Sequence, residues 1–130
     1  MAIDFSLSPE LEEIRLRIRT FIDAEVKPVE EIIDREKLDE TDRERYVSSL
    51  IGMRKKAFAE KLWLPHMPKE WGGMGLGHVE LAMVQAEAAK SRYGPWVLNC
   101  QAPDEGNMHT LLHWGTDEQR ENYLLSLIHI

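Results

Sequence analysis

The fold class is decided by residues 64–91, which read LPHMPKEWGGMGLGHVELAMVQAEAAKS. Prolines and glycines crowd the first half of this stretch, a composition typical of a turn because these residues interrupt regular hydrogen bonding. The second half, from His78 to Ser91, contains neither Gly nor Pro. Small or apolar side chains recur in it at near-helical spacing, at Val79, Ala82, Met83, Ala86 and Ala89. The stretch therefore predicts a tight turn followed by a helix that buries this face.

Towards the N-terminus, the sequence predicts a first helix that starts at Ser8. A capping serine followed by Pro9 favours a helix start, because the missing proline N–H costs nothing in the first turn. Apolar residues then recur at helical spacing, at Leu11, Ile14, Ile18, Phe21, Ile22 and Val26. Pro28 is expected to end or kink this helix, and the charged stretch of residues 25–45 is expected to lie exposed on the surface.

A second helix is predicted between these two segments. Thr41 and Glu44 have the spacing of a capping box, and the helix is expected to run to about Leu62. Its inward side chains are expected to be Tyr46, Leu50, Met53 and Ala57, with the aliphatic stem of Lys61 beside them.

The C-terminal quarter of the chain predicts two further helices. Residues 104–114 form a helical pattern that ends at Gly115, with Met108, Leu111 and Leu112 facing inward. Thr116 and Gln119 fit a capping box for a last helix that reaches Leu124. Because no segment alternates as a strand would, the predicted fold class is all-α and resembles a helical bundle.

Composition narrows the class of function. The 130 residues are enough for one domain, and 43% hydrophobic with 30% charged residues is typical of a globular protein without a membrane span. A net charge of -7 argues against nucleic acid as a partner, because phosphate binding needs clustered cations. The single cysteine, Cys100, cannot form an intrachain disulfide, and residues 1–5 lack the pattern of a targeting leader. A cytoplasmic location is therefore expected.

One spacing suggests a metal site. Glu105, His109 and His113 recur every four residues, so they would lie on one stripe of a helix and could present a carboxylate and two imidazoles. Apolar neighbours claim the adjacent face, and no second set of ligands is evident, so a packing or solvated role is the preferred interpretation. The same interpretation is given to His66 and His78, and no metal ligand is assigned.

Three other features receive structural interpretations. The glycines of residues 72–77 lack the register of a dinucleotide-binding loop and are interpreted as a turn between helices. Cys100 is interpreted as a small buried residue, since a catalytic thiol needs a paired histidine that sequence cannot reveal. The four tryptophans could line a site for a flat cofactor, but packing is preferred for each of them, Trp63, Trp71, Trp96 and Trp114.

Two motifs carry a resemblance to a known family. Residues 64–76 read LPxxPKEWGGMGL and residues 115–124 read GTDEQRxxYL, where x is any residue. With the acidic helix that ends near Glu87, they resemble the N-terminal helical domain of the acyl-CoA dehydrogenase family over nearly the whole chain. The segment at residues 102–108 is similar to the longer-chain branch, whose members can carry an added phosphotransferase domain.

The resemblance implies an α-domain at residues 1–124 of an FAD enzyme. Such an enzyme removes a proton from the α-carbon of an acyl-CoA while hydride leaves the β-carbon for the flavin, giving a trans-2-enoyl-CoA. It implies an electron-transfer flavoprotein as acceptor and a homo-oligomer. The family's central β-domain and C-terminal helices supply most FAD contacts and the catalytic Glu, so no catalytic residue is expected here. Four residues become candidates for the acyl-pocket lining by position, Asn99, Cys100, Pro103 and Met108.

Residues 125–130, LSLIHI, depart from the family pattern, which continues with a Pro-containing segment. They resemble the translation of a transposon end used as a sequencing adapter, so we expect a non-native tail on a truncated and inactive fragment. Two alternatives stay open at this point. One is a self-standing helical module that binds another protein through an exposed apolar side, and the other is a small helical metal-binding protein.

Overall fold

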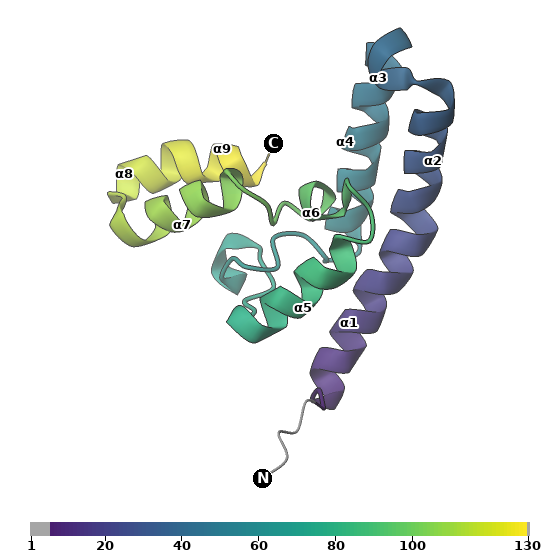
Figure 1. Ribbon diagram of the computed structural model, residues 1–130. Helices are drawn as coiled ribbons and strands as arrows, with labels where there is room; N and C mark the ends of the chain where they lie inside the picture. The colour runs from purple at the N-terminus through teal and green to yellow at the C-terminus, as the bar shows by residue number, and fades with distance from the viewer. Residues whose placement is uncertain (1–5, 130) are drawn as a thin grey trace.

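A long helical rod and a returning helix frame one side of the molecule (Figure 1). The computed structural model describes residues 6–129, and no strand occurs among them, as predicted. The rod is built from α1 (Pro9–Phe21), a π-helical turn (Ile22–Val26) and α2 (Lys27–Glu36), and α3 (Leu38–Thr41) turns the chain into α4 (Arg43–Ala59). The expectation about a leader rests on residues 1–5, which lie outside the described residues.

The rod begins as predicted but continues further. The Ser8 hydroxyl accepts a hydrogen bond from the Leu11 N–H at 3.2 Å, and Pro9 occupies the first turn. Pro28 does not end the helix, because the preceding π turn accommodates the residue that lacks an N–H. The stretch of residues 25–45 is largely exposed, yet it is helical, and it buries Ile33 and Leu38.

The predicted capping box of α4 is wrong. Thr41 ends α3, where its hydroxyl donates to the Lys37 carbonyl at 2.9 Å, and the Asp42 carboxylate caps α4 by accepting from the Arg45 N–H at 3.1 Å. The Thr41 hydroxyl is thus engaged in the turn before α4, and Asp42, the next residue, caps α4 instead. The helix ends at Ala59, before Leu62, and it buries Met53 and Ala57 as predicted.

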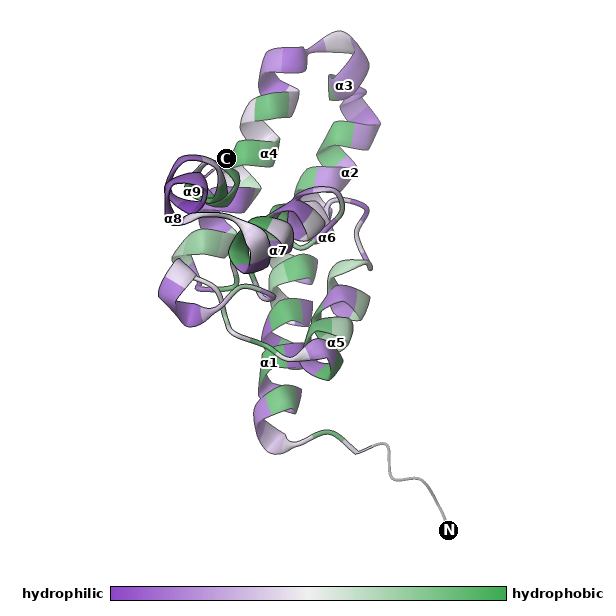
Figure 2. Ribbon diagram, turned by 90° about the vertical axis from the view of Figure 1, so that its left-hand side faces the viewer, coloured by the Kyte–Doolittle hydropathy of each residue, from purple (hydrophilic) through white to green (hydrophobic). Residues whose placement is uncertain are grey.

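The glycine-rich turn and the next helix follow. A short 3-10 helix (Lys69–Trp71) leads to Gly72 with a φ of 82°, and a Cβ on Gly73 would meet the Met67 carbonyl oxygen at 2.1 Å. The turn prediction is therefore confirmed. Helix α5 (His78–Ala88) lies beside α1 in both views (Figures 1 and 2), with Figure 2 showing how hydrophobic and hydrophilic residues interleave along both helices.

The predicted inward face of α5 is wrong. The buried residues are Leu81, Val84, Glu87 and Ala88, whereas Val79 is 68% exposed. Apolar residues cover most of this helix's circumference, so two overlapping stripes both have helical spacing. Packing against α1 selects the stripe that can also deliver Glu87 to the arginines of α1.

The C-terminal part is a helix pair joined to the rest through α6 (Gly94–Val97). Helix α7 (Asp104–Trp114) has the predicted bounds and buries Met108. The capping box that starts α8 (Asp117–Gln119) is also confirmed, but the helix passes through a π turn (Arg120–Leu124) into α9 (Leu125–Ile128). Ile128 is buried, and its carbonyl accepts from the Trp63 ring N–H at 3.2 Å. None of the helices within residues 6–129 has the length and apolar composition that a bilayer crossing requires.

Candidate functional site

A bend in the chain after α4 places His66 beside a second bend after α6. The Leu64 N–H donates to the Leu98 carbonyl at 3.0 Å, which holds the two segments together. Leu64 and Asn99 have φ values of 53° and 55°, in the left-handed region that few residues other than glycine adopt. His66 is consequently buried at 5% exposure, with its ring against the Asn99 backbone.

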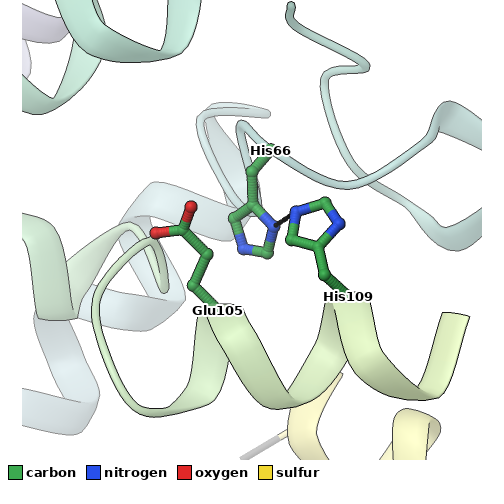
Figure 3. Close-up of side chains that lie close together, drawn as sticks. All are labelled: His66, Glu105 and His109. Carbon is green, nitrogen blue, oxygen red and sulfur yellow. Dashed lines mark hydrogen bonds between the residues drawn. The ribbon is translucent and has the colours of Figure 1, made fainter. Parts of the chain in front are cut away.

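Helix α7 brings two more polar side chains to this ring. Glu105 and His109 lie one turn apart on the same face, and both are half-buried. His66 Nδ1 lies 3.0 Å from His109 Nε2, and one ligand atom from each of the three residues lies within 4.8 Å of the others. Figure 3 shows the His66 ring between the Glu105 carboxylate and the His109 ring, and we call this group the His66 cluster.

The hydrogen-bond partners assign the protons of the cluster. His66 Nε2 lies 3.0 Å from the Asn99 carbonyl, which can only accept, so this nitrogen carries the proton. In the neutral ring, Nδ1 of His66 is then an acceptor, and His109 Nε2 donates to it. Burial lowers the pKa of His66 below its usual range, which favours this neutral form.

Gln85 of α5 fixes the carboxylate of the cluster. Its side-chain amide donates to Glu105 Oε2 at 3.1 Å and to the Cys100 carbonyl at 3.0 Å. Burial, with a smaller contribution from the Glu105 charge, raises the pKa of the Cys100 thiol to about 12. The thiol is therefore protonated near neutral pH, in agreement with its interpretation as a small buried residue.

The structure brings together a different set of residues from the stripe of Glu105, His109 and His113, for which a packing or solvated role was the preferred interpretation. His113 is exposed and stacks on His109 with 6.0 Å between ring centroids, so it does not reach the cluster. The residue that joins Glu105 and His109 is His66, which comes from a turn far away in the sequence. Helical spacing reports only neighbours on one helix, and the sequence contains no signal for the 64–98 backbone pairing that delivers His66.

A separate apolar groove lies between α4 and the C-terminal end of the chain. Its volume is about 390 Å³, and its lining consists of Ile51, Arg54, Lys55, Phe58, Trp63, Trp96, Ile128 and His129. The Arg54 guanidinium stacks 3.7 Å from the Trp96 ring centroid and 5.2 Å from that of Trp63, and it donates to the Trp96 carbonyl. Two of the four tryptophans thus meet here, whereas Trp71 is half-buried elsewhere and Trp114 is 86% exposed.

The four residues expected to line an acyl pocket are not part of this groove. Asn99, Cys100 and Met108 are buried, and Pro103 is exposed after a cis peptide bond. The Asn99 side-chain amide donates to the Leu127 carbonyl at 3.3 Å, which links the bend after α6 to α9. Their role at an acyl chain stays a prediction.

A second buried polar group joins α1 to α5. The Glu87 carboxylate accepts from Arg15 and Arg19 at 2.8 Å and from Lys90 at 2.5 Å. We call these four residues the Glu87 cluster. The hydrogen bond from Arg19, with those from Lys90 and Arg15, lowers the pKa of Glu87 to about 2.

Known proteins are similar to this chain in sequence and in fold. The family model for the "Acyl-CoA dehydrogenase, N-terminal domain" matches residues 8–129. Acyl-CoA dehydrogenase family member 10 of Mus musculus is 33% identical over 127 residues, which are 94% of this chain and 12% of that protein. Family member 11 of Homo sapiens is 30% identical over 120 residues, covering 90% of this chain and 15% of that protein.

A solved structure from Mycobacterium abscessus, assigned to the acyl-CoA dehydrogenases, has a TM-score of 0.83 and 34% identity. It covers 95% of this chain and 32% of its own. The chain therefore spans between 12% and 32% of the length of these relatives.

Proposed function

Because the chain belongs to the acyl-CoA dehydrogenase family, as its N-terminal helical domain, we propose that it is one part of a longer FAD-dependent enzyme. That enzyme oxidises the α,β carbon–carbon bond of an acyl-CoA to a trans-2-enoyl-CoA. The observation that carries the proposal is the shared fold, with a TM-score of 0.83 at 34% identity over 95% of the chain. An electron-transfer flavoprotein as acceptor and a homo-oligomeric state belong to the same proposal.

The residues of this chain fit one wall of such a site. The groove at Arg54, Trp63 and Trp96 is lined mainly by apolar and aromatic surface, which suits an acyl chain or a flat ring. These three residues precede residues 125–130, the expected non-native tail, which adds Ile128 and His129 to the lining. The pyrophosphate of FAD needs several N–H or cationic donors, and the Arg54 guanidinium already donates to the Trp96 carbonyl. With Arg54 and Lys55 as its cationic side chains among mainly apolar neighbours, the groove suits apolar packing better than the anionic part of FAD, and we assign none of its residues to the flavin.

Exposed apolar side chains support a role as part of a larger assembly. Ile51 and Phe58 are 45% and 62% exposed, and both line the same apolar groove. A contiguous exposed apolar surface of this kind marks a place that another domain or chain covers. The remainder of the same polypeptide is the covering surface that we propose.

The test begins with the source DNA, read independently across codons 120–140. The protein encoded by the continued reading frame is then purified beside the 130-residue chain. We expect the longer protein to carry FAD, seen by its visible absorbance, and to reduce an electron acceptor when an acyl-CoA is added. The 130-residue chain should do neither. A longer protein without flavin, or a short chain with stoichiometric flavin and turnover, would overturn the proposal.

A further inference from the structure

We propose that the His66 cluster is a binding site for a divalent transition metal of the zinc class. The ligands would be His66 Nδ1, His109 Nε2 and one carboxylate oxygen of Glu105. This inference does not depend on the proposed dehydrogenase activity, because it rests only on the positions of the three side chains and their hydrogen-bond partners.

The spacing of the nitrogens fits the metal. Two ligands bound tetrahedrally at Zn–N distances of about 2.0–2.1 Å lie about 3.3 Å apart. His66 Nδ1 and His109 Nε2 are 3.0 Å apart, and one ligand atom from each of the three residues lies within 4.8 Å of the others. The two nitrogens need to separate by only a few tenths of an ångström, whereas the Glu105 carboxylate needs to approach them by up to about 1.5 Å, which rotation of its side chain can supply.

The surrounding partners hold the ligands as metal sites require. A metal-bound histidine usually donates its other ring N–H to a backbone carbonyl or carboxylate, and His66 Nε2 does so to the Asn99 carbonyl at 3.0 Å. A bound carboxylate is likewise held by a hydrogen bond, and Gln85 donates to Glu105 at 3.1 Å. These partners come from two elements outside the cluster, the bend after α6 and helix α5.

The donor types identify the class of metal. Two imidazoles and one carboxylate are typical ligands of Zn²⁺ and similar ions, whereas Mg²⁺ and Ca²⁺ prefer oxygen ligands throughout. When the ion binds, it takes the place of the proton between the two rings, and His109 carries its single proton on Nδ1 instead. The ion would tie the bend at His66 to helix α7.

The experiment titrates the 130-residue chain, prepared without a polyhistidine tag, with Zn²⁺ by calorimetry and with Co²⁺ by visible absorbance. We expect one ion per chain and a Co²⁺ spectrum of low coordination number. The variants His109→Gln and Glu105→Gln should each weaken Zn²⁺ binding at least about tenfold, because each removes a ligand. His113→Gln is the matched control, since His113 stacks on His109 outside the cluster, and it should bind within about twofold of the parent chain.

A fourth variant, Gln85→Leu, separates a built site from adventitious surface binding. It keeps all three ligands but removes the hydrogen bond that orients Glu105, so affinity should fall about tenfold. Circular dichroism confirms that each variant is folded before it is titrated. Absence of stoichiometric binding, or equal losses in His113→Gln and His109→Gln, would overturn the proposal whatever flavin activity the longer protein has.

Discussion

The two polar clusters of this domain, each built around one buried side chain, Glu87 or His66, differ in what completes them. In the Glu87 cluster, one carboxylate forms ion pairs with Arg15, Arg19 and Lys90. The protein's own side chains therefore neutralise its negative charge. In the His66 cluster, two imidazoles and a carboxylate converge with no cationic side chain among the three. The first arrangement is complete and supports the fold, whereas the second is completed by a proton or a metal ion.

The Glu87 cluster should therefore dominate stability. We expect Glu87→Gln to lower the free energy of unfolding by about 2 to 3 kcal/mol, because three cations lose the anion that they share at the α1–α5 contact. Urea unfolding at neutral pH measures this change. Glu31→Gln is the control, since Glu31 lies exposed on α2, and its effect should stay within about 0.5 kcal/mol. If Glu87→Gln and Glu31→Gln lowered the free energy of unfolding equally, the Glu87 cluster would have no special role in stability.

The same cluster predicts an acid dependence. The pKa of Glu87 is lowered to about 2 in the folded chain, from an ordinary value of 4.5. A lowered carboxyl pKa contributes stability that is fully present above pH 4.5 and is lost as the pH falls towards 2.

The gap in stability between the parent chain and Glu87→Gln should thus narrow steadily between pH 4.5 and pH 2, by about 3 kcal/mol at most. Urea midpoints at pH 7, 4 and 3 test the trend. A gap that stays constant across this range would show that the effect of Glu87 comes from packing and not from its charge.

The starts of several helices were predictable from the sequence because they depend only on residues close together in the chain. Ser8 with Pro9 marks the start of α1, and Thr116 with Gln119 marks the start of α8, since capping depends on residues within one turn. The face of α5 was not predictable, because its apolar side chains surround the helix. The choice was made by a charge on Glu87 that pairs with α1, which is a tertiary contact.

The candidate site was half predictable for the same reason. Glu105 and His109 share a helical turn, so their spacing alone brings them together. His66 arrives through the backbone bond from Leu64 to Leu98, which joins two segments that each contain a left-handed residue. Leu64 is a residue type that rarely adopts that conformation, so no rule of sequence pointed to this bend.

The His66 cluster should matter less for stability than the Glu87 cluster when metal is absent. We expect His109→Gln to lower the free energy of unfolding by about 1 kcal/mol or less, because it removes one neutral hydrogen bond from a half-buried side chain. Thermal melts with a chelator present measure this. With Zn²⁺ added, the parent chain should gain in melting temperature and the variant should not. If His109→Gln lowered stability without metal as much as Glu87→Gln does, the His66 cluster would matter as much for the fold as the Glu87 cluster, contrary to this prediction.

The exposed end of α7 should contribute to neither cluster. Trp114 is 86% exposed and lies one residue beyond His113, so Trp114→Ser should change the free energy of unfolding by about 0.5 kcal/mol at most and leave Zn²⁺ affinity unchanged. Its large apolar surface should instead promote association, so sedimentation of the concentrated chain should show less oligomer in the variant. Asn107→Ala, an exposed polar position on the same helix, is the control and should leave association unchanged. Loss of Zn²⁺ binding in Trp114→Ser would mean that the packing of α7, and not the three ligands His66, Glu105 and His109, sets the site.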